Sequence, residues 1–165
     1  MKIPGFSIIE FLLYIGIVTL IIGCTTTALM YTYSSVVRAH HSLHEMSMLS
    51  TACDVFAHDV YEASDARDTW YQPDVHTILF RCGTTDMCWL VKEKKLMRVT
   101  GTYDRNSQRW TQRTISVMST GVTAWACTLI PSLHASDTIC AVTCEIAGDD
   151  SSVTRYVALR VGRVV

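Results

Sequence analysis

The position of Glu10 suggests a chemical role more clearly than that of any other residue, because this carboxylate lies near the start of a strongly apolar segment. No charged side chain follows it until Arg38, and the segment from Phe6 to Leu29 is mostly apolar. At about 1.5 Å of helix per residue, this segment is long enough to cross a hydrocarbon layer of about 30 Å. A carboxylate in such a layer costs on the order of a few kcal/mol unless it is paired, so Glu10 needs a partner.

An amine created by a cut between Gly5 and Phe6 would be the natural partner. The block from Gly5 to Glu10 reads Gly-Phe-Ser-Ile-Ile-Glu and continues into an unbroken apolar run. This block resembles the processing motif of type IV prepilins and pseudopilins. The resemblance implies that a prepilin peptidase cleaves after Gly5 and methylates Phe6, and that Glu10 serves in assembly.

One long helix is expected to carry this segment. No Gly or Pro lies between Gly23 and Pro73, and apolar residues recur at helical spacing from Met46 to Val60. We predict a helix from Phe6 to about Asp65. Residues 1–5 form a leader before this helix. Residues 6–30 are its transmembrane part, and residues 31–65 are its amphipathic part. The positive charge of the leader predicts that the leader is cytoplasmic and that the rest of the chain lies outside.

Residues 66–165 form the predicted head. Its pattern is short runs rich in Val, Ile, Thr and aromatic residues, separated by turn-forming sequences. The runs are 76–81, 88–91, 96–100, 109–117, 122–130, 138–146 and 153–161. No helical pattern lies between them, so antiparallel strands are expected and parallel βαβ units with a phosphate site are not. The predicted fold class is therefore α+β, a long N-terminal helix packed on an antiparallel head.

The head shares features with one branch of the pilin superfamily. An acidic helix end with Asp59 and Ala63, the hairpin containing Leu96-x-Arg98, and the closing pair of strands resemble J-type minor pseudopilins and W-type minor pilins. The resemblance implies a subunit near the tip of a pseudopilus or pilus that initiates or caps assembly. Its expected partners are other minor and major subunits, contacted through the N-terminal helix, and the inner membrane. Secretion, adhesion, motility and DNA uptake all use such subunits.

Cysteine usage fits export of the head. The chain has seven cysteines, of which Cys24 lies in the apolar segment and the others lie beyond it. An even number beyond a membrane segment suits an oxidising compartment. Cys82 and Cys88 flank a glycine-containing turn and are the first choice for a disulfide. Cys127 could meet Cys140 or Cys144 across neighbouring strands, and unbridged buried thiols are the alternative.

Other chemistries find weaker support. The chain has no recognisable catalytic motif, so we expect neither an enzyme nor a cofactor. His40 and His44 lie one helical turn apart, but two imidazoles without a third ligand predict no metal site. Basic residues around the hairpin could contact DNA, although lysines at a hairpin tip more often protect a sheet edge. They are Lys92, Lys94, Lys95, Arg98, Arg105, Arg109 and Arg113.

Two other membrane-attached architectures compete with the pilin interpretation. Ile21-Ile22-Gly23-Cys24 fits a lipoprotein signal, in which Cys24 is lipidated and the preceding residues are removed. A flexible tether would then be expected after Cys24, whereas the helical pattern continues, and Glu10 would have no purpose. A signal-anchored exported enzyme or receptor would need no cut after Gly5. The modified N-terminus distinguishes the three.

Overall fold

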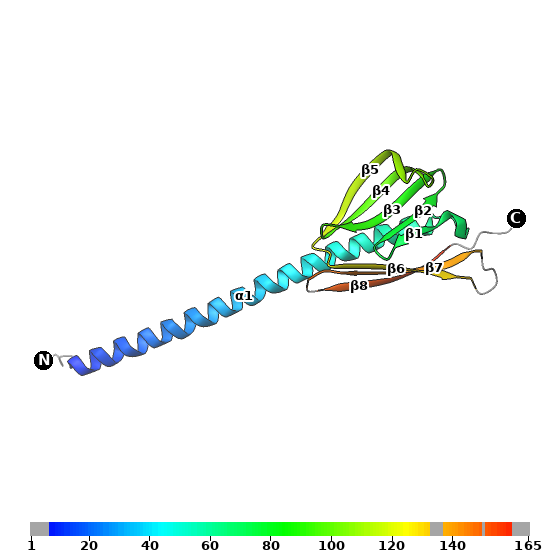
Figure 1. Ribbon diagram of the computed structural model, residues 1–165. Helices are drawn as coiled ribbons and strands as arrows, with labels where there is room; N and C mark the ends of the chain where they lie inside the picture. Colours follow the sequence, from blue (N-terminus) through cyan, green and yellow to red (C-terminus); the bar gives the residue numbers. More distant parts are fainter. Residues whose placement is uncertain (1–6, 133–136, 150, 160–165) are drawn as a thin grey trace. The chain divides into compact units, whose positions relative to one another are not determined.

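The computed structural model describes residues 7–132, 137–149 and 151–159. Between His41 and Ser42 the chain divides into two compact units. The first unit contains the apolar part of the N-terminal helix, and the second contains the rest of that helix and all the strands (Figure 1).

Helix α1 spans Ile8–Tyr61, which confirms the predicted long helix; Phe6 lies outside the described residues. The first part of α1 is long and apolar enough to cross a membrane, and its side chains are exposed. Its hydroxyl side chains donate to backbone carbonyls one turn earlier, as Thr25 does to Ile21 at 2.7 Å and Thr27 to Gly23 at 2.9 Å. These bonds satisfy polar groups that would be costly in an apolar environment.

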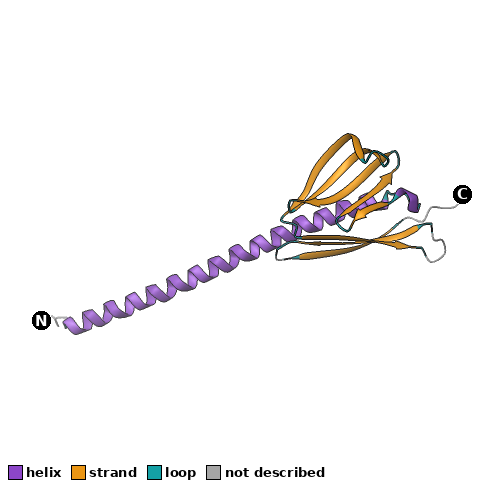
Figure 2. Cartoon of the chain, viewed as in Figure 1, coloured by secondary structure: helices purple, strands orange, loops and turns teal. Residues whose placement is uncertain are grey.

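The head contains two antiparallel sheets (Figure 2). After the short helix η1 (Arg67–Thr69), five strands pair in chain order: β1 (Tyr71–Asp74), β2 (Thr77–Cys82), β3 (Thr85–Lys92), β4 (Lys95–Asp104) and β5 (Arg109–Thr120). The second sheet has the order β6 (Ala124–Pro131), β7 (Ile139–Ala147) and β8 (Ser152–Ala158). Each predicted run corresponds to one of the strands β2 to β8, so the α+β fold is confirmed.

The main core of the head forms where the C-terminal half of α1 lies between the two sheets (Figure 1). Phe56 meets Trp89 of the larger sheet edge-on, with ring centroids 5.4 Å apart, and meets Trp125 of the smaller sheet in the same way at 5.2 Å. Such edge-to-face contacts add about 0.5 to 1.5 kcal/mol to the burial of the rings. The helical stripe from Met46 to Val60 was therefore correctly assigned to the core, although Met46 itself is exposed.

The β4–β5 hairpin contains two irregularities. The register shifts between Leu96 and Met97 and again between Thr100 and Thr102. At the second shift a Cβ atom on Gly101 would lie 2.8 Å from the backbone oxygen of Gln112, so only glycine fits without movement. Asp86 supports this distortion, because its buried carboxylate accepts the Tyr103 N–H at 2.8 Å and a bond from Arg81 Nε at 2.9 Å.

Candidate assembly surfaces

At the start of α1, Glu10 is directed back toward the N-terminal end of the helix. Its Oε2 atom accepts a hydrogen bond from the Ser7 N–H at 3.0 Å, and the Ser7 hydroxyl accepts one from the Ile9 N–H at 3.4 Å. Both bonds satisfy amides that have no partner within the helix, at the end where the helix dipole favours a negative charge. Gly5 and Phe6, the predicted cleavage and methylation site, lie outside the described residues.

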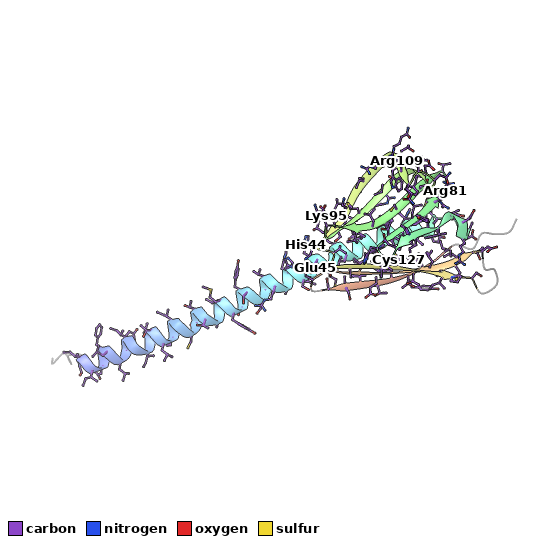
Figure 3. All side chains as sticks on the ribbon, in the orientation of Figure 1. His44, Glu45, Arg81, Lys95, Arg109 and Cys127 are labelled. Carbon is purple, nitrogen blue, oxygen red and sulfur yellow. The ribbon has the colours of Figure 1, made fainter. Side chains whose placement is uncertain are left out.

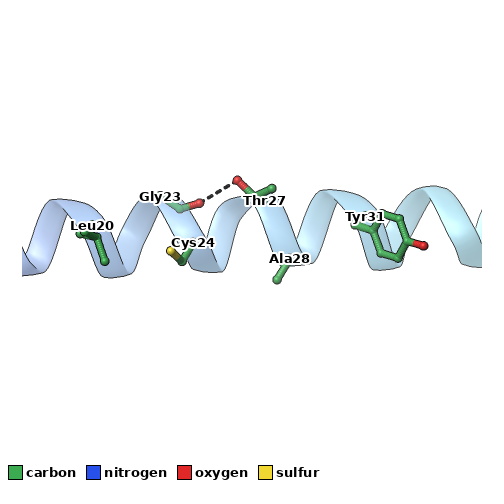
Figure 4. Close-up of a pocket in the computed structure, with 6 residues that line it drawn as sticks. All are labelled: Leu20, Gly23, Cys24, Thr27, Ala28 and Tyr31. Carbon is green, nitrogen blue, oxygen red and sulfur yellow. Dashed lines mark hydrogen bonds between the residues drawn. The ribbon is translucent and has the colours of Figure 1, made fainter.

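Farther along α1, small residues form a shallow hollow on the helix surface (Figure 4). Gly23 and Thr27 are four residues apart, as are Cys24 and Ala28, and the larger Leu20 and Tyr31 complete the lining. Small side chains at four-residue spacing let a second helix approach closely within a membrane. Cys24 belongs to this small-residue face of α1.

In the head, an ion pair joins the end of α1 to the larger sheet. Asp59 is almost fully buried and accepts bonds from Arg98 Nε at 2.6 Å and Arg98 Nη2 at 2.8 Å. Trp89 Nε1 donates to the same carboxylate at 2.9 Å. The hydrogen bond from Arg98 to Asp59 raises the pKa of the guanidinium above its ordinary value. The two residues that sequence analysis singled out on separate segments are thus in direct contact.

The smaller sheet is joined to α1 by contacts that sequence analysis missed. Glu45 Oε1 accepts the Asp149 N–H at 2.8 Å, and the Glu45 side chain occupies the space that a Cβ atom on Gly148 would need. Farther along the helix, Arg155 Nη2 lies 3.0 Å from Asp54 Oδ1. These pairs are separated by about a hundred residues in sequence, and no local pattern links their members.

The outer face of the larger sheet has an unexpected apolar surface. A hollow of about 470 Å³ is lined by apolar and charged side chains. The apolar ones are Leu90, Met97, Val99, Trp110, Ile115 and Val117, and the charged ones are Lys92, Glu93, Lys95 and Arg113. Ile115 and Val117 are 49% and 54% exposed. An antiparallel sheet that covers a core on one face normally presents polar residues on the other. An apolar outer face of this kind is typical of a surface that contacts a partner.

The seven basic residues considered for DNA binding do not form one patch, although Lys92, Lys95 and Arg113 line the same hollow of the larger sheet. Arg98 is engaged with Asp59, and Arg105 donates to the backbone oxygen of Asp68. Lys95 and Arg109 lie at opposite ends of the β4–β5 hairpin (Figure 3). No group of three or more His, Cys, Asp or Glu side chains that could hold a metal ion was found among the described residues.

The preferred disulfide between Cys82 and Cys88 requires correction. Cys82 is opposite Thr85 and Cys88 is opposite Leu79 in the β2–β3 register, an odd offset that places the two thiols on opposite faces of the sheet. Cys82 packs against the main core, whereas Cys88 packs with Leu79 and Val99 on the outer side. Burial raises the pKa of Cys82 to about 11 and that of Cys88 to about 12.

The second predicted group of cysteines has a different arrangement. Cys127 on β6 is directly opposite Cys144 on β7, as one of the two predicted pairings requires. Cys140 lies at the irregularity between Ile130 and Pro131, where it has no opposite residue, and its thiol donates to the Ile130 oxygen at 3.3 Å. Because of this irregularity, Ile139 lies in the core where Cys140 would otherwise lie. All seven cysteines are thiols in the structure.

No protein-family model and no curated protein matches the chain. The residues and their geometry therefore have to carry the assignment of function.

Proposed function

We propose that this chain is a minor pseudopilin or minor type IV pilin subunit that initiates or caps the assembly of a fibre. It acts through assembly instead of catalysis, in a machine for secretion, adhesion, motility or DNA uptake. The observation that carries the proposal is the block Gly5 to Glu10 at the start of a helix that continues without interruption to Tyr61. The first half of α1 is apolar and the second half packs in a β-rich head. Such a helix can hold the subunit in a membrane before assembly and can pack in a fibre afterwards.

In this role the helix holds the subunit in the cytoplasmic membrane, with the leader inside and the head outside. A prepilin peptidase removes the leader after Gly5 and methylates the amine of Phe6. Glu10 then pairs with the Phe6 amine of a neighbouring subunit. The pair lies in an apolar layer, where an unpaired charge costs on the order of several kcal/mol. Because that pair forms at one axial offset only, it selects how the subunit joins its neighbours.

Two surfaces described above support lateral contact. The small-residue face around Gly23 and Ala28 allows close approach of another helix in the membrane. The apolar outer face of the larger sheet, with Ile115 and Val117 exposed, suits contact with the head of another minor subunit. The tip of a pseudopilus or pilus is the location that such a subunit would occupy.

The lipoprotein alternative predicts a flexible tether after Cys24, whereas α1 continues from this residue to Tyr61. Helix α1 is continuous on both sides of this residue, and the hydroxyls of Thr25, Thr26 and Thr27 donate to backbone carbonyls of the preceding turn. A lipidated cysteine would instead begin a chain whose helical residues 8–23 had been removed. Glu10 and its bond to Ser7 would then be absent from the mature protein.

The experiment that tests the proposal is the intact mass and N-terminal sequence of the membrane-extracted protein. We expect methylated Phe6 at the N-terminus when a prepilin peptidase is co-expressed, and retained Met1 when an inactive peptidase is used as the control. Lipid on Cys24, or an unchanged mass in the presence of active peptidase, would show that the proposal is wrong.

A further inference from the structure

Three buried thiols meet in the head, one from α1 and two from the smaller sheet. Cys53 on α1, Cys127 on β6 and Cys144 on β7 belong to the same core cluster. Cys53 and Cys144 are fully buried and Cys127 nearly so. Figure 3 labels Cys127 where the smaller sheet meets the helix. The sequence predicts that Cys127 pairs with Cys144 or Cys140, and it indicates no partner for Cys53.

Independent contacts place Cys144 over the turn of α1 that carries Cys53. Cys144 is directly opposite Arg155 in the β7–β8 register, so the two side chains share a face of the sheet. Arg155 Nη2 reaches Ser50 Oγ at 3.4 Å and Asp54 Oδ1 at 3.0 Å, the residues that flank Cys53 on the helix. The Cys144 thiol, on the same face as Arg155, therefore faces Cys53, because Arg155 contacts Ser50 and Asp54 on either side of it.

The two thiols also affect each other's pKa. The neighbouring Cys144 lowers the pKa of Cys53, and Cys53 together with burial raises the pKa of Cys144. Burial raises the pKa of Cys127, and the nearby Cys53 raises it further; the strand residue opposite Cys127 is Cys144. The three thiols are therefore neighbours of one another, and only one pair of them can form a bond.

The geometry favours Cys53 as that partner. Residues directly opposite on antiparallel strands have Cβ atoms about 4.5 to 5.5 Å apart, whereas a disulfide has a mean Cβ separation of about 3.8 Å. Joining Cys127 to Cys144 would therefore draw β6 and β7 together. Cys53 approaches from α1, so its separation from Cys144 is not fixed by strand pairing and can shorten without drawing β6 and β7 together.

We propose that Cys53 and Cys144 form a disulfide that ties α1 to the smaller sheet, leaving Cys127 as a buried thiol. The inference rests on the proposed function, because that function places the head in an oxidising compartment. The oxidant is a disulfide-containing thiol oxidase of that compartment. One cysteine thiolate attacks its disulfide and releases one oxidase thiol. The second cysteine thiolate then attacks the mixed disulfide and releases the other oxidase thiol, so two electrons and two protons pass from the cysteines to the oxidase.

Burial sets when this bond can form and what it does. Both sulfurs are inaccessible in the finished head, so the oxidase must act before α1 has closed onto the sheets. The bond joins residues far apart in sequence, and a cross-link over a long loop restricts the unfolded chain more than one over a short loop. A Cys53–Cys144 bond therefore secures the junction between the helix and the C-terminal sheet.

The first test is disulfide mapping of the full-length processed protein, extracted in detergent with an alkylating agent present. Trypsin leaves Cys127, Cys140 and Cys144 on one peptide, so cleavage before Asp137 is needed to separate Cys127 from the other two. We expect a cross-linked peptide pair containing Cys53 and Cys144, with Cys127 alkylated. Fragmentation of this pair distinguishes Cys144 from Cys140, which stays on the same peptide. A bond from Cys127 to Cys53 or Cys144, a Cys53–Cys140 bond, or alkylation of all three would overturn the inference.

Matched variants separate the bond from simple packing. Cys53→Ala should lose the cross-link and lower the melting temperature by about 10 °C. Cys127→Ala removes a buried thiol from the same cluster and should keep the cross-link, with a smaller decrease. In protein from cells that lack the thiol oxidase, the melting temperatures of wild type and Cys53→Ala should differ by only about a few degrees. An undiminished difference in those cells would assign the effect to packing and reject the disulfide.

The N-terminus of the same samples keeps the two proposals distinguishable. Methylated Phe6 with three alkylated cysteines would retain the proposed function and reject the disulfide. A lipidated Cys24 would reject the proposed function, whatever the state of Cys53 and Cys144.

Discussion

Asp59 at the end of α1 and Arg98 on β4 form a two-pronged ion pair, with nitrogen–oxygen distances of 2.6 and 2.8 Å. Trp89 contributes a third bond to the carboxylate. The pair fastens the last turns of the helix to the larger sheet, just as Glu45 and Asp54 fasten earlier turns to the smaller one. Each sheet is therefore held to α1 by polar contacts at the margin of an apolar core.

Removing one partner of this pair should destabilise the head. Asp59→Asn leaves Arg98 without a counter-charge, and because Arg98 keeps some access to water we expect a loss of about 2 to 3 kcal/mol in the free energy of unfolding. Urea titration of the full chain in detergent, followed by tryptophan fluorescence, measures it. Arg113→Met on exposed β5 is the control. The double variant Asp59→Leu, Arg98→Leu should recover part of the loss; an additive loss would show that the two residues are not coupled.

The buried thiol of Cys88 predicts a dependence of stability on alkaline pH. Its pKa is raised to about 12 in the folded protein from an ordinary value of 9.0, so the folded state holds its proton more strongly than the unfolded state. The resulting stability is present below pH 9 and is lost as pH rises toward 12, by about 1.4 kcal/mol per pH unit. Unfolding of wild type and Cys88→Ala, compared from pH 8 to 10.5, should show the difference in stability shrinking above pH 9. A constant difference would contradict the prediction.

Glu10→Val should separate processing from assembly. The variant makes the membrane segment more apolar, so we expect normal insertion and normal cleavage after Gly5. Without the carboxylate the Phe6 amine of a neighbour has no partner, and recovery of the other minor subunits with the processed variant should fall. Ile9→Val is the matched control. Normal co-purification together with normal output of the machine would remove Glu10 from the mechanism.

Charge on the outer sheet face should weaken contact with partner heads without unfolding the chain. We expect the melting temperature of the double variant Ile115→Lys, Val117→Lys to lie within about a few degrees of the wild-type value, because both side chains are about half exposed. Its co-purification with minor subunits should decrease. Thr114→Lys adds a charge to the same strand on the opposite face, opposite Thr100 and not Arg98, and should have no such effect. Equal losses in both variants would assign the effect to charge alone.

Local pattern was sufficient to predict α1 and the strands β2 to β8, because each has its own periodicity and turn residues. Strand β1 was missed because Pro73 lies within it; proline is compatible with this position at the edge of the sheet. The Cys82–Cys88 pairing failed because the turn signal did not reveal the register, and a one-residue difference in register changes the face on which a side chain lies.

Contacts between distant segments were harder to predict. Asp59 and Arg98 were each visible through a family resemblance, yet nothing in their spacing said that they would meet. Cys53 appeared only as a core position on the helical stripe, because its neighbour Cys144 is on another element. The apolar residues Ile115 and Val117 alternate as a strand requires, but alternation alone does not say which side of the sheet faces the core.

The two register shifts along β5 have a consequence for crowding. Among the described residues β5 pairs only with β4, so its outer edge displays backbone groups that another strand could use. Shifts after Leu96 and after Thr100 break that edge into short, bent pieces. In a fibre, where neighbouring heads stand at very high local concentration, such an edge offers no continuous template for sheet growth from one subunit to the next. Heads can then be held close together in an assembly without fusing into an aggregate.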